Sequence, residues 1–225
     1  MENKFEQSSA AEKVSAYIDA WRPGLIVLLI AAVVGVGAYA AGVALVARAD
    51  KNGLAAVDTI SYNLTEGSSS LSDAELAERR NAALSALEPY LSKRRITGVR
   101  ANMLAAEVAY AKEDFAQAAS YWLAAAAKGK NSYTAPLAYF NAAVCFENTG
   151  DLDNAVKNYK AAAETEDFLL FSRASFCCGR TMEKQGNADA ALEVYNKLYG
   201  KTPDDSWAKL AKSRIIDIEN SKKAE

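Results

Sequence analysis

A short pattern recurs in the C-terminal half of the chain at almost constant spacing. An alanine is followed four residues later by an aromatic residue in the segments 118–122, 155–159 and 191–195. Successive alanines are 37 and 36 residues apart. A period in the mid-thirties is typical of helical solenoids, in which each helix pair buries its apolar face only by stacking on a neighbouring pair. The period therefore predicts an all-α repeat domain.

The composition agrees with helices and excludes several classes of function. Of the 225 residues, 51% are hydrophobic and only four are proline, and alanine is abundant, which favours helices. The net charge of −2 indicates no nucleic-acid partner. The chain contains no histidine, which excludes Ser-His-Asp and Cys-His catalysis and histidine metal sites. We expect a chain that is not an enzyme and has no catalytic residues, no cofactor and no metal site.

Three cysteines, Cys145, Cys177 and Cys178, show neither the spacing of a disulfide framework nor that of a zinc site. Free cysteine behaves as a small buried hydrophobe, so we interpret all three as core residues. Thiol chemistry at the adjacent pair is the alternative, and it is the one enzymatic hypothesis that the sequence leaves open.

Residues 23–47 form an uncharged apolar segment, PGLIVLLIAAVVGVGAYAAGVALVA. A helix over 24–47 is about 36 Å long, enough to cross a hydrocarbon core of about 30 Å with some tilt. Trp21 and Arg22 precede the segment, and Arg48 and Lys51 follow it. Aromatic and cationic residues are typical of membrane interfaces. The segment therefore predicts a single transmembrane helix in contact with a lipid bilayer.

A cleaved signal peptide is the alternative, because Ala38-Tyr39-Ala40 resembles a small-x-small cleavage site. The apolar run continues beyond that site to Ala47, which is longer than the apolar region of a signal peptide. The preceding segment is also acidic as well as basic. We therefore favour an uncleaved signal anchor.

The orientation of the span follows from the charges that flank it. Lys4, Lys13 and Arg22 precede the span, against Arg48 and Lys51 just after it. The bias is small, but long C-terminal domains translocate largely regardless of loop charge. We expect a bacterial inner (cytoplasmic) membrane protein with a cytoplasmic N-terminus and a periplasmic or otherwise extracytoplasmic C-terminal domain.

Small residues repeat at a spacing of four within the span, at Ala31 and Gly35, at Gly37 and Ala41, and at Ala38 and Gly42. Such pairs let two membrane helices approach closely. A homo-oligomer formed through the transmembrane helix is therefore a hypothesis, against the simpler interpretation that Gly and Ala are common in spans.

The residues around the recurring alanines resemble the tetratricopeptide repeat family, whose pattern is W-x2-L-G-x2-Y, then A-x3-F, then P. The second unit offers Tyr139-x2-Ala142-Ala143-x2-Phe146, a turn at Gly150-Asp151 and Ala155-x3-Tyr159. The third unit offers Cys178-Gly179-x2-Met182, a turn at Gly186-Asn187 and Ala191-x3-Tyr195. The first unit is poorer, with Ala105-Ala106, a turn at Glu113-Asp114 and Ala118-x3-Trp122. The resemblance covers about 98–218.

This pattern implies an α-solenoid of about three helix pairs. Small residues at 106, 143 and 179 let the two helices of a pair lie close together, and the aromatic residue of the second helix fills the gap toward the next pair. A capping helix is expected over 203–218, opened by Pro203. Its residues expected to pack inward are Trp207, Leu210, Ile215 and Ile216.

The expected organisation has four parts. They are a short N-terminal tail at 1–22, a transmembrane helix at 23–47, a membrane-proximal helical region with a degenerate repeat at 48–97, and the repeat domain with its cap at 98–225. Within the third part, Ser72 and Glu75 form a capping box that predicts a helix over 72–91.

The resemblance implies a protein or peptide partner on the concave face, which the first helix of each pair lines. The candidates of the first unit are Arg100, Met103, Glu107 and Tyr110; those of the second are Phe140, Asn141, Val144 and Asn148; those of the third are Arg173, Phe176, Arg180 and Lys184. The cations of the third unit are expected to hold a carboxylate, and Phe140 and Phe176 to serve as apolar anchors.

These features together predict a membrane-anchored repeat scaffold that mediates protein–protein interactions, in envelope protein assembly or translocation. The layout resembles bacterial single-pass inner-membrane tetratricopeptide proteins such as the ancillary subunit of the Sec translocon. Two alternatives are a self-associating membrane scaffold and an envelope or division coordinator of the Tol-Pal type, which the closing TPDDSWAKLAKSRI resembles.

Overall fold

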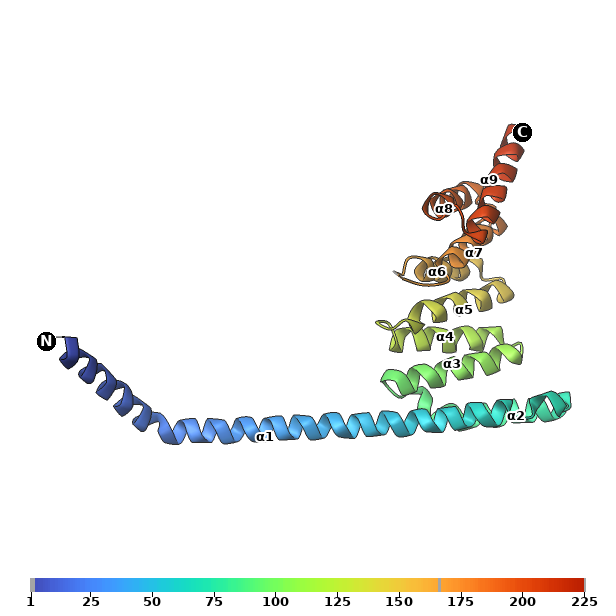
Figure 1. Cartoon of the computed structure of the whole chain (residues 1–225). Helices are drawn as coiled ribbons and strands as arrows, with labels where there is room; N and C mark the ends of the chain where they lie inside the picture. Colours follow the sequence, from blue (N-terminus) through green and yellow to red (C-terminus); the bar gives the residue numbers. More distant parts are fainter. Residues whose placement is uncertain (1–2, 166, 225) are drawn as a thin grey trace. The chain divides into compact units, whose positions relative to one another are not determined.

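The computed structural model describes residues 3–165 and 167–224, and all regular elements in those ranges are helices (Figure 1). They are α1 (Asn3–Thr65), the 3-10 turn η1 (Ser68–Ser70), α2 (Asp73–Leu91), α3 (Arg95–Ala111), α4 (Phe115–Lys128), α5 (Thr134–Thr149), α6 (Leu152–Ala163), α7 (Phe171–Lys184), α8 (Ala188–Lys201) and α9 (Ser206–Ala224). The chain divides into two compact units, residues 1–49 and residues 50–225.

The first unit consists of the N-terminal part of α1. The expected apolar span lies inside this helix, and the first two residues of the expected N-terminal tail lie outside the described part of the chain. The large apolar side chains from Leu25 to Val46 are exposed, with Leu28, Val36 and Leu45 each more than 65% accessible. Within the described residues, this is the one helix long and apolar enough, by length and composition, to cross a membrane.

The second unit begins with the last part of α1, because this helix continues beyond the apolar segment to Thr65. The predicted capping box is present at the start of α2, where the Ser72 hydroxyl accepts from the Glu75 backbone N–H and the Glu75 carboxylate accepts from the Ser72 backbone N–H. Val57 of α1 and Leu87 of α2 are buried against α3. This packing covers one face of the first repeat helix.

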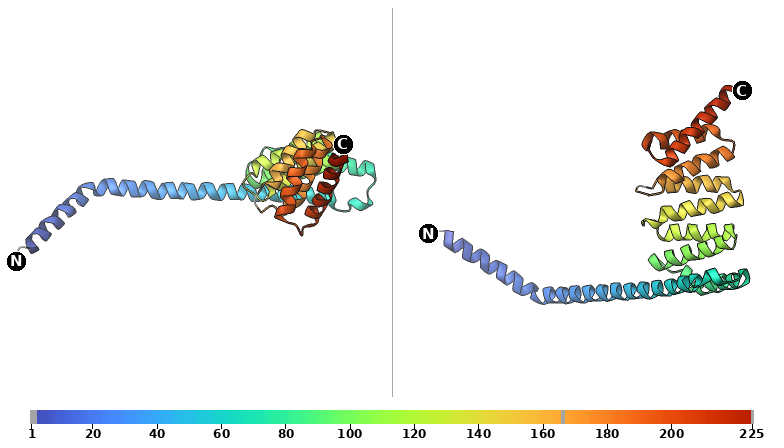
Figure 2. Two further views of the ribbon diagram at one scale, coloured as in Figure 1. Left: turned by 90° about the horizontal axis from the view of Figure 1, so that it is seen from above. Right: turned by 45° about the vertical axis from the view of Figure 1, so that its right-hand side comes forward.

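From α3 onward each helix packs on the next one along the chain. The right-hand view of Figure 2 shows these helices as a stack in chain order. The pairs are α3 with α4, α5 with α6, and α7 with α8, and α9 packs on both α8 and α7 at the end. The predicted all-α solenoid of three helix pairs with a C-terminal capping helix is confirmed.

The same local device connects the two helices of each pair. A residue with positive φ stands first, at Glu113, Gly150 and Gly186. The next residue then caps the second helix through its side chain, which accepts a backbone N–H three residues later. The accepting side chains belong to Asp114, Asp151 and Asn187, and the donating backbone N–H groups belong to Gln117, Asn154 and Ala190, respectively. Glycine adopts a positive φ freely, so the first turn, which has Glu113 instead, keeps the same backbone at a steric cost.

The recurring alanine and aromatic residues form the core of each pair. Ala118, Ala155 and Ala191 are completely buried, and the rings that follow them are at most 4% exposed. A Cβ on Gly179 would lie 2.5 Å from Cε1 of Tyr195. Tyr195 therefore packs tightly on the first helix of its own pair, and not only toward the next element as the sequence predicted. The small residues are required because the aromatic ring occupies the space of a side chain.

The capping helix differs in detail from its prediction. Pro203 lies three residues before α9, and the Asp205 carboxylate accepts from the backbone N–H groups of Trp207 and Ala208. The expectation that Leu210 packs inward is wrong, because this side chain is 48% exposed.

The expectation for Ile216 is also wrong, because it is 46% exposed, whereas Ile215 is buried as expected. The buried face of α9 consists of Ala208, Ala211, Ile215 and Ile218. These positions recur every three or four residues and share one side of a helix, and positions 210 and 216 lie off that side.

The contact between Gly179 and Tyr195 gives the first testable prediction. Gly179→Ala places a methyl group inside the Tyr195 ring, and we expect the free energy of unfolding to fall by about 1–3 kcal/mol. Gly200→Ala in α8 is the matched control, because no atom lies within 4 Å of its Cβ position. Removing a helical glycine there should leave stability unchanged or raise it by up to about 1 kcal/mol. Urea unfolding of the full chain in detergent measures both, and equal stability of the two variants would contradict the proposed packing.

Candidate partner-binding groove

A cavity of about 340 Å³ lies along the first helices of the second and third pairs, α5 and α7. Tyr159 from α6 and Trp207 from the capping helix complete its lining. The lining residues are Phe140, Val144, Glu147, Asn148, Tyr159, Arg173, Cys177, Arg180, Lys184 and Trp207. We call this cavity the groove.

The groove brings together half of the residues that the sequence proposed for partner binding. These are Phe140, Val144, Asn148, Arg173, Arg180 and Lys184. Two candidates from the same helices lie elsewhere. Asn141 is half-buried outside the groove lining, and Phe176 packs against Tyr195 and Trp207, with ring centroids 5.7 and 5.5 Å apart.

The four candidates of the first unit do not reach the groove. Arg100 pairs with Asp58 of α1 at 3.2 Å, and Met103 is buried in the core. Glu107 lines a separate cavity of about 300 Å³ formed with residues of α1, η1 and α2, and Tyr110 lies edge-on to a phenylalanine of α4. For Arg100 and Glu107 the reason is that α1 and α2 pack on α3, so the face of α3 that the sequence left free is occupied by this chain. Met103 and Tyr110 pack toward α4 instead.

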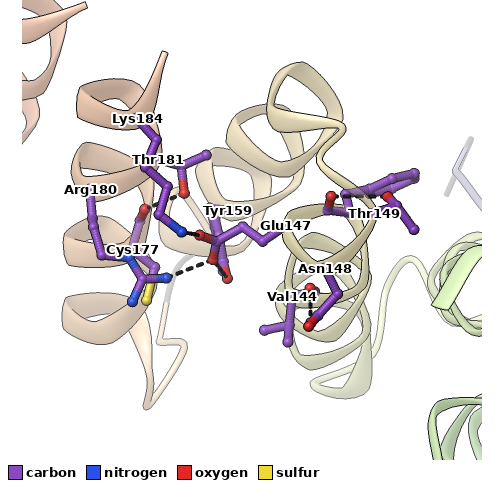
Figure 3. Close-up of polar contacts among 10 residues, drawn as sticks. Val144, Glu147, Asn148, Thr149, Tyr159, Cys177, Arg180, Thr181 and Lys184 are labelled. Atoms are coloured by element: carbon purple, nitrogen blue, oxygen red, sulfur yellow. Dashed lines mark hydrogen bonds and ion pairs between the residues drawn. The ribbon is translucent and has the colours of Figure 1, made fainter. Parts of the chain in front are cut away.

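Glu147 of α5 lies at the centre of the polar contacts in the groove (Figure 3). Its side chain is 9% exposed, and its carboxylate accepts hydrogen bonds from three groups. The donors are the Tyr159 hydroxyl at 2.6 Å, the Arg180 guanidinium at 2.6 Å and the Lys184 ammonium at 2.9 Å. Tyr159 belongs to the same pair as Glu147, whereas both cations belong to the next pair, so the carboxylate connects two consecutive repeats.

The contacts keep Glu147 ionised. Burial acts to raise the pKa of its carboxyl, but the hydrogen bonds from Lys184 and Tyr159 and the two positive charges outweigh burial and lower the pKa. The pKa of Tyr159 is raised, first by burial and then by its hydrogen bond to Glu147, so the hydroxyl keeps the proton that it donates.

This arrangement corrects the role expected for the cations of the third unit. Arg180 and Lys184 already bind a carboxylate of this chain, although both side chains remain about half exposed. Arg173 is different, since within the described residues it has no carboxylate partner within 4.0 Å. Its guanidinium carbon lies 5.1 Å from the centroid of the Phe140 ring and 5.6 Å from that of Trp207. Such contacts orient an exposed guanidinium without neutralising it.

The link between Tyr159 and Glu147 recurs one repeat later. The Tyr195 hydroxyl donates to Glu183 at 2.5 Å, and Glu183 pairs with Arg214 of α9. The two glutamates are 36 residues apart, and each stands 12 residues before its tyrosine. The first unit has Trp122 in place of the tyrosine and therefore lacks the link.

Sequence reasoning missed four of the groove residues, Glu147, Tyr159, Cys177 and Trp207. The two glutamates had a detectable signal, because they follow the same period as the alanines. Trp207 had none, since its position in the groove depends on how α9 packs across the end of the stack.

The three cysteines are buried and free, as the sequence predicted. Burial raises the pKa of Cys145 and of Cys178 to about 11. Burial also raises the pKa of Cys177, although Arg180 acts in the opposite direction. Thiolate is the reactive form of cysteine, so these shifts disfavour thiol chemistry near neutral pH.

A family model described as tetratricopeptide repeat matches residues 103–167 and 150–206. A TPR repeat-containing protein from Treponema pallidum (strain Nichols) is 38% identical over 113 residues, which are 50% of this chain and 47% of the relative. The chain thus spans about half the length of this curated relative. These matches confirm the repeat pattern that the sequence predicted.

Solved structures agree on the fold. Two crystal structures of nearly identical TPR-like repeats, from a protein described as a kinesin light chain of Podosopora anserina, superpose with a TM-score of 0.55. The superposed region covers 78% of this chain and 89% of the kinesin light chain fragment in each crystal structure, at 9% sequence identity. A likeness at this identity concerns the fold alone.

Removing the Glu147 carboxylate tests the link between repeats. We expect Glu147→Gln to lower the free energy of unfolding by about 1–2 kcal/mol, because charge-assisted hydrogen bonds are lost but the half-exposed cations can be solvated. The matched control is Glu164→Gln, whose exposed carboxylate lies 3.9 Å from Lys160 and should contribute less than about 0.5 kcal/mol.

The pH dependence of the same variant provides the second readout. The folded-state pKa of Glu147 is lowered, so its contribution is complete above the ordinary value of 4.5 and is lost as pH falls through the lower folded pKa. The difference between wild type and Glu147→Gln, measured by urea unfolding at a series of pH values, should therefore shrink below that value. A difference that stays constant into acid would show that ionisation of Glu147 does not stabilise the fold.

Proposed function

Because residues 103–206 carry tetratricopeptide repeats, we infer that this chain is a membrane-anchored scaffold that binds a segment of another protein in its groove. Such repeats imply a protein–protein interaction scaffold, and the fold is typically non-catalytic. The observation that carries the proposal is Arg173, an exposed cation held between two aromatic rings on the wall of an open groove.

The chemistry of the groove indicates the kind of segment it accepts. Its lining has three cations and one carboxylate, so two positive charges remain in excess after Glu147 is counted. Phe140, Tyr159 and Trp207 supply aromatic surface beside that charge. Aromatic and arginine side chains are the residues on which binding energy concentrates in protein interfaces. A peptide that presents an acidic side chain next to an apolar one matches both properties.

Helix α1 supports the membrane part of the proposal. The apolar side chains of the segment 23–47 are exposed, and a helix exposing so much apolar surface is stable when lipid surrounds it. We place the repeat domain on the extracytoplasmic side of a bacterial inner membrane, where it serves envelope protein assembly or translocation. The bacterial origin of the relative supports this setting.

The membrane anchor is tested by introducing charge into the span. The full chain should stay in the membrane pellet after alkaline extraction, and Leu29→Arg combined with Val33→Arg should release it, because each arginine costs about 2.5–3.5 kcal/mol at the centre of a span. Ala16→Arg with Ala20→Arg, outside the apolar segment, is the matched control and should stay in the pellet.

Topology is read from the same preparations. Protease added to intact spheroplasts should digest the repeat domain. Protection of the domain in spheroplasts, with digestion only after lysis, would place it on the cytoplasmic side and contradict the proposed localisation.

The groove is tested with a photo-cross-linking residue at Asn148, which lines it. In membranes, the full chain should cross-link to a discrete protein, and Arg173→Glu should weaken that interaction at least about tenfold, which corresponds to about 1.4 kcal/mol. Lys209→Glu on α9 makes the same change of charge on an exposed surface outside the groove. It should leave the yield unchanged.

Thermal unfolding of both variants controls for folding. A cross-linker at Lys157, outside the groove, shows the background. Equal yields from wild type and Arg173→Glu would sink the assignment of the groove as the binding surface.

A further inference from the structure

Four segments of the second unit meet at one corner of the repeat stack, next to the point where the chain leaves the apolar segment. The Thr97 hydroxyl at the start of α3 donates to the Asp50 carbonyl oxygen of α1 at 3.2 Å. A Cβ on Gly53 would lie 2.6 Å from the Thr97 side chain, so the two helices touch there.

Gly98 brings the other two segments to the same corner. A Cβ at this position would lie 1.8 Å from the carbonyl oxygen of Lys93 and 3.1 Å from Cδ of Lys128. The connection between α2 and α3 and the end of α4 therefore both adjoin the start of α3. In Figure 1 the α4–α5 loop lies on the same side of the stack as the start of α3.

This corner is strongly basic. We call this surface the basic corner, and its cations are Lys51, Lys93, Arg94, Arg95, Lys128 and Lys130. Five of them are exposed, and within the described residues none forms an ion pair. Asp50 and Glu88 lie nearby and offset part of the charge, but four positive charges remain in excess. The chain as a whole carries −2, so the basic corner is a local concentration of charge.

Exposed apolar groups accompany the cations. Tyr133, three residues after Lys130 in the α4–α5 loop, is 89% exposed, and Ile96 at the start of α3 is 41% exposed. The next loop between two helix pairs, from α6 to α7, carries Glu164 and Asp167 instead. Lysine, arginine and exposed tyrosine are enriched at the boundary between membrane and water.

Chain connectivity brings the basic corner close to the bilayer. The apolar segment ends at Ala47, and Asp50, which contacts α3, follows only three residues later. Three residues span at most about 11 Å even when fully extended. The headgroup layer is about 5–8 Å deep, and the electrostatic screening length is about 8 Å at physiological ionic strength. Any orientation of the repeat domain thus leaves the start of α3 within reach of the headgroups.

We propose that the basic corner binds the anionic phospholipid headgroups of the bilayer that α1 enters, with Tyr133 inserted at the interface. The proposal rests on the membrane anchor argued above. Phosphate-bearing headgroups match the five exposed cations, which have no carboxylate partner among the described residues, and the tether keeps these cations at high local concentration near the headgroups. Binding at this corner fixes the start of the repeat stack on the membrane surface, so the domain does not swing freely about its anchor.

The experiment uses the full chain in lipid nanodiscs, either of phosphatidylcholine alone or of equal parts phosphatidylcholine and phosphatidylglycerol. An environment-sensitive fluorophore is attached at Asn131→Cys, in the loop between Lys130 and Tyr133. We expect its emission to shift to the blue in the anionic discs relative to the neutral ones, and added salt to reverse the shift. The same fluorophore at Lys157→Cys, on α6, should show no difference between the two discs.

Charge variants identify the residues responsible. Lys93→Gln, Arg94→Gln and Lys130→Gln together should abolish the shift at the Asn131→Cys label. Lys157→Gln, Lys197→Gln and Lys209→Gln remove the same number of exposed positive charges elsewhere and should leave it intact. Lys128 is not altered, because its side chain packs beside Gly98.

Three other results would contradict the proposal, and each of them identifies which part of it is wrong. If the chain co-elutes with both discs but its emission is identical in them, the headgroup contact is wrong and the membrane anchor stands. If the chain fails to enter discs at all, the anchor and the contact fail together. A shift that appears only when solubilised membrane proteins are added would assign the basic corner to an acidic protein instead of a lipid.

Discussion

The close contact between a small residue on the first helix of each pair and an aromatic ring on the second is the constraint on which the repeat domain depends. Gly179 has no room for a side chain because the Tyr195 ring occupies that space. A helix pair packed this closely is thin and leaves apolar surface on both sides, which only a neighbouring pair can cover. The stack therefore follows from the contact, and α9 is needed to cover the last exposed surface.

The same tyrosines position the polar link between repeats. The hydroxyl of each of these tyrosines donates to a glutamate on the first helix of its own pair. Glu147 then receives Tyr159 from one side and the cations of α7 from the other. Buried carboxylates require several partners to remain ionised, and this geometry provides three. The groove lies on the polar side of this contact, so the packing constraint determines where the groove lies.

The period, the turns and the helix pairs could be predicted from the sequence because each depends on residues close together along the chain. The groove could be predicted only in part. Residues on α5 and α7 share a face that helical periodicity reveals, whereas the contribution of Trp207 depends on how a capping helix crosses the stack. The prediction of groove residues in the first unit was wrong for a related reason. Arg100 has the repeat position of a groove residue, but it pairs with Asp58, which lies 42 residues earlier in the chain, and no local pattern indicates that pairing.

The two positive surfaces of the domain differ in how their charges are held, and this difference separates their roles. In the groove, Arg180 and Lys184 share Glu147, so an incoming carboxylate has to compete with a nearly buried internal one. Arg173 has no such competitor and lies between aromatic rings, so recognition there requires both a charge and an apolar group, which favours a specific peptide. At the basic corner none of the cations is paired with a carboxylate of the described residues, and five of the six side chains are exposed. Such a surface attracts any dense negative charge, which suits a headgroup layer better than a single sequence.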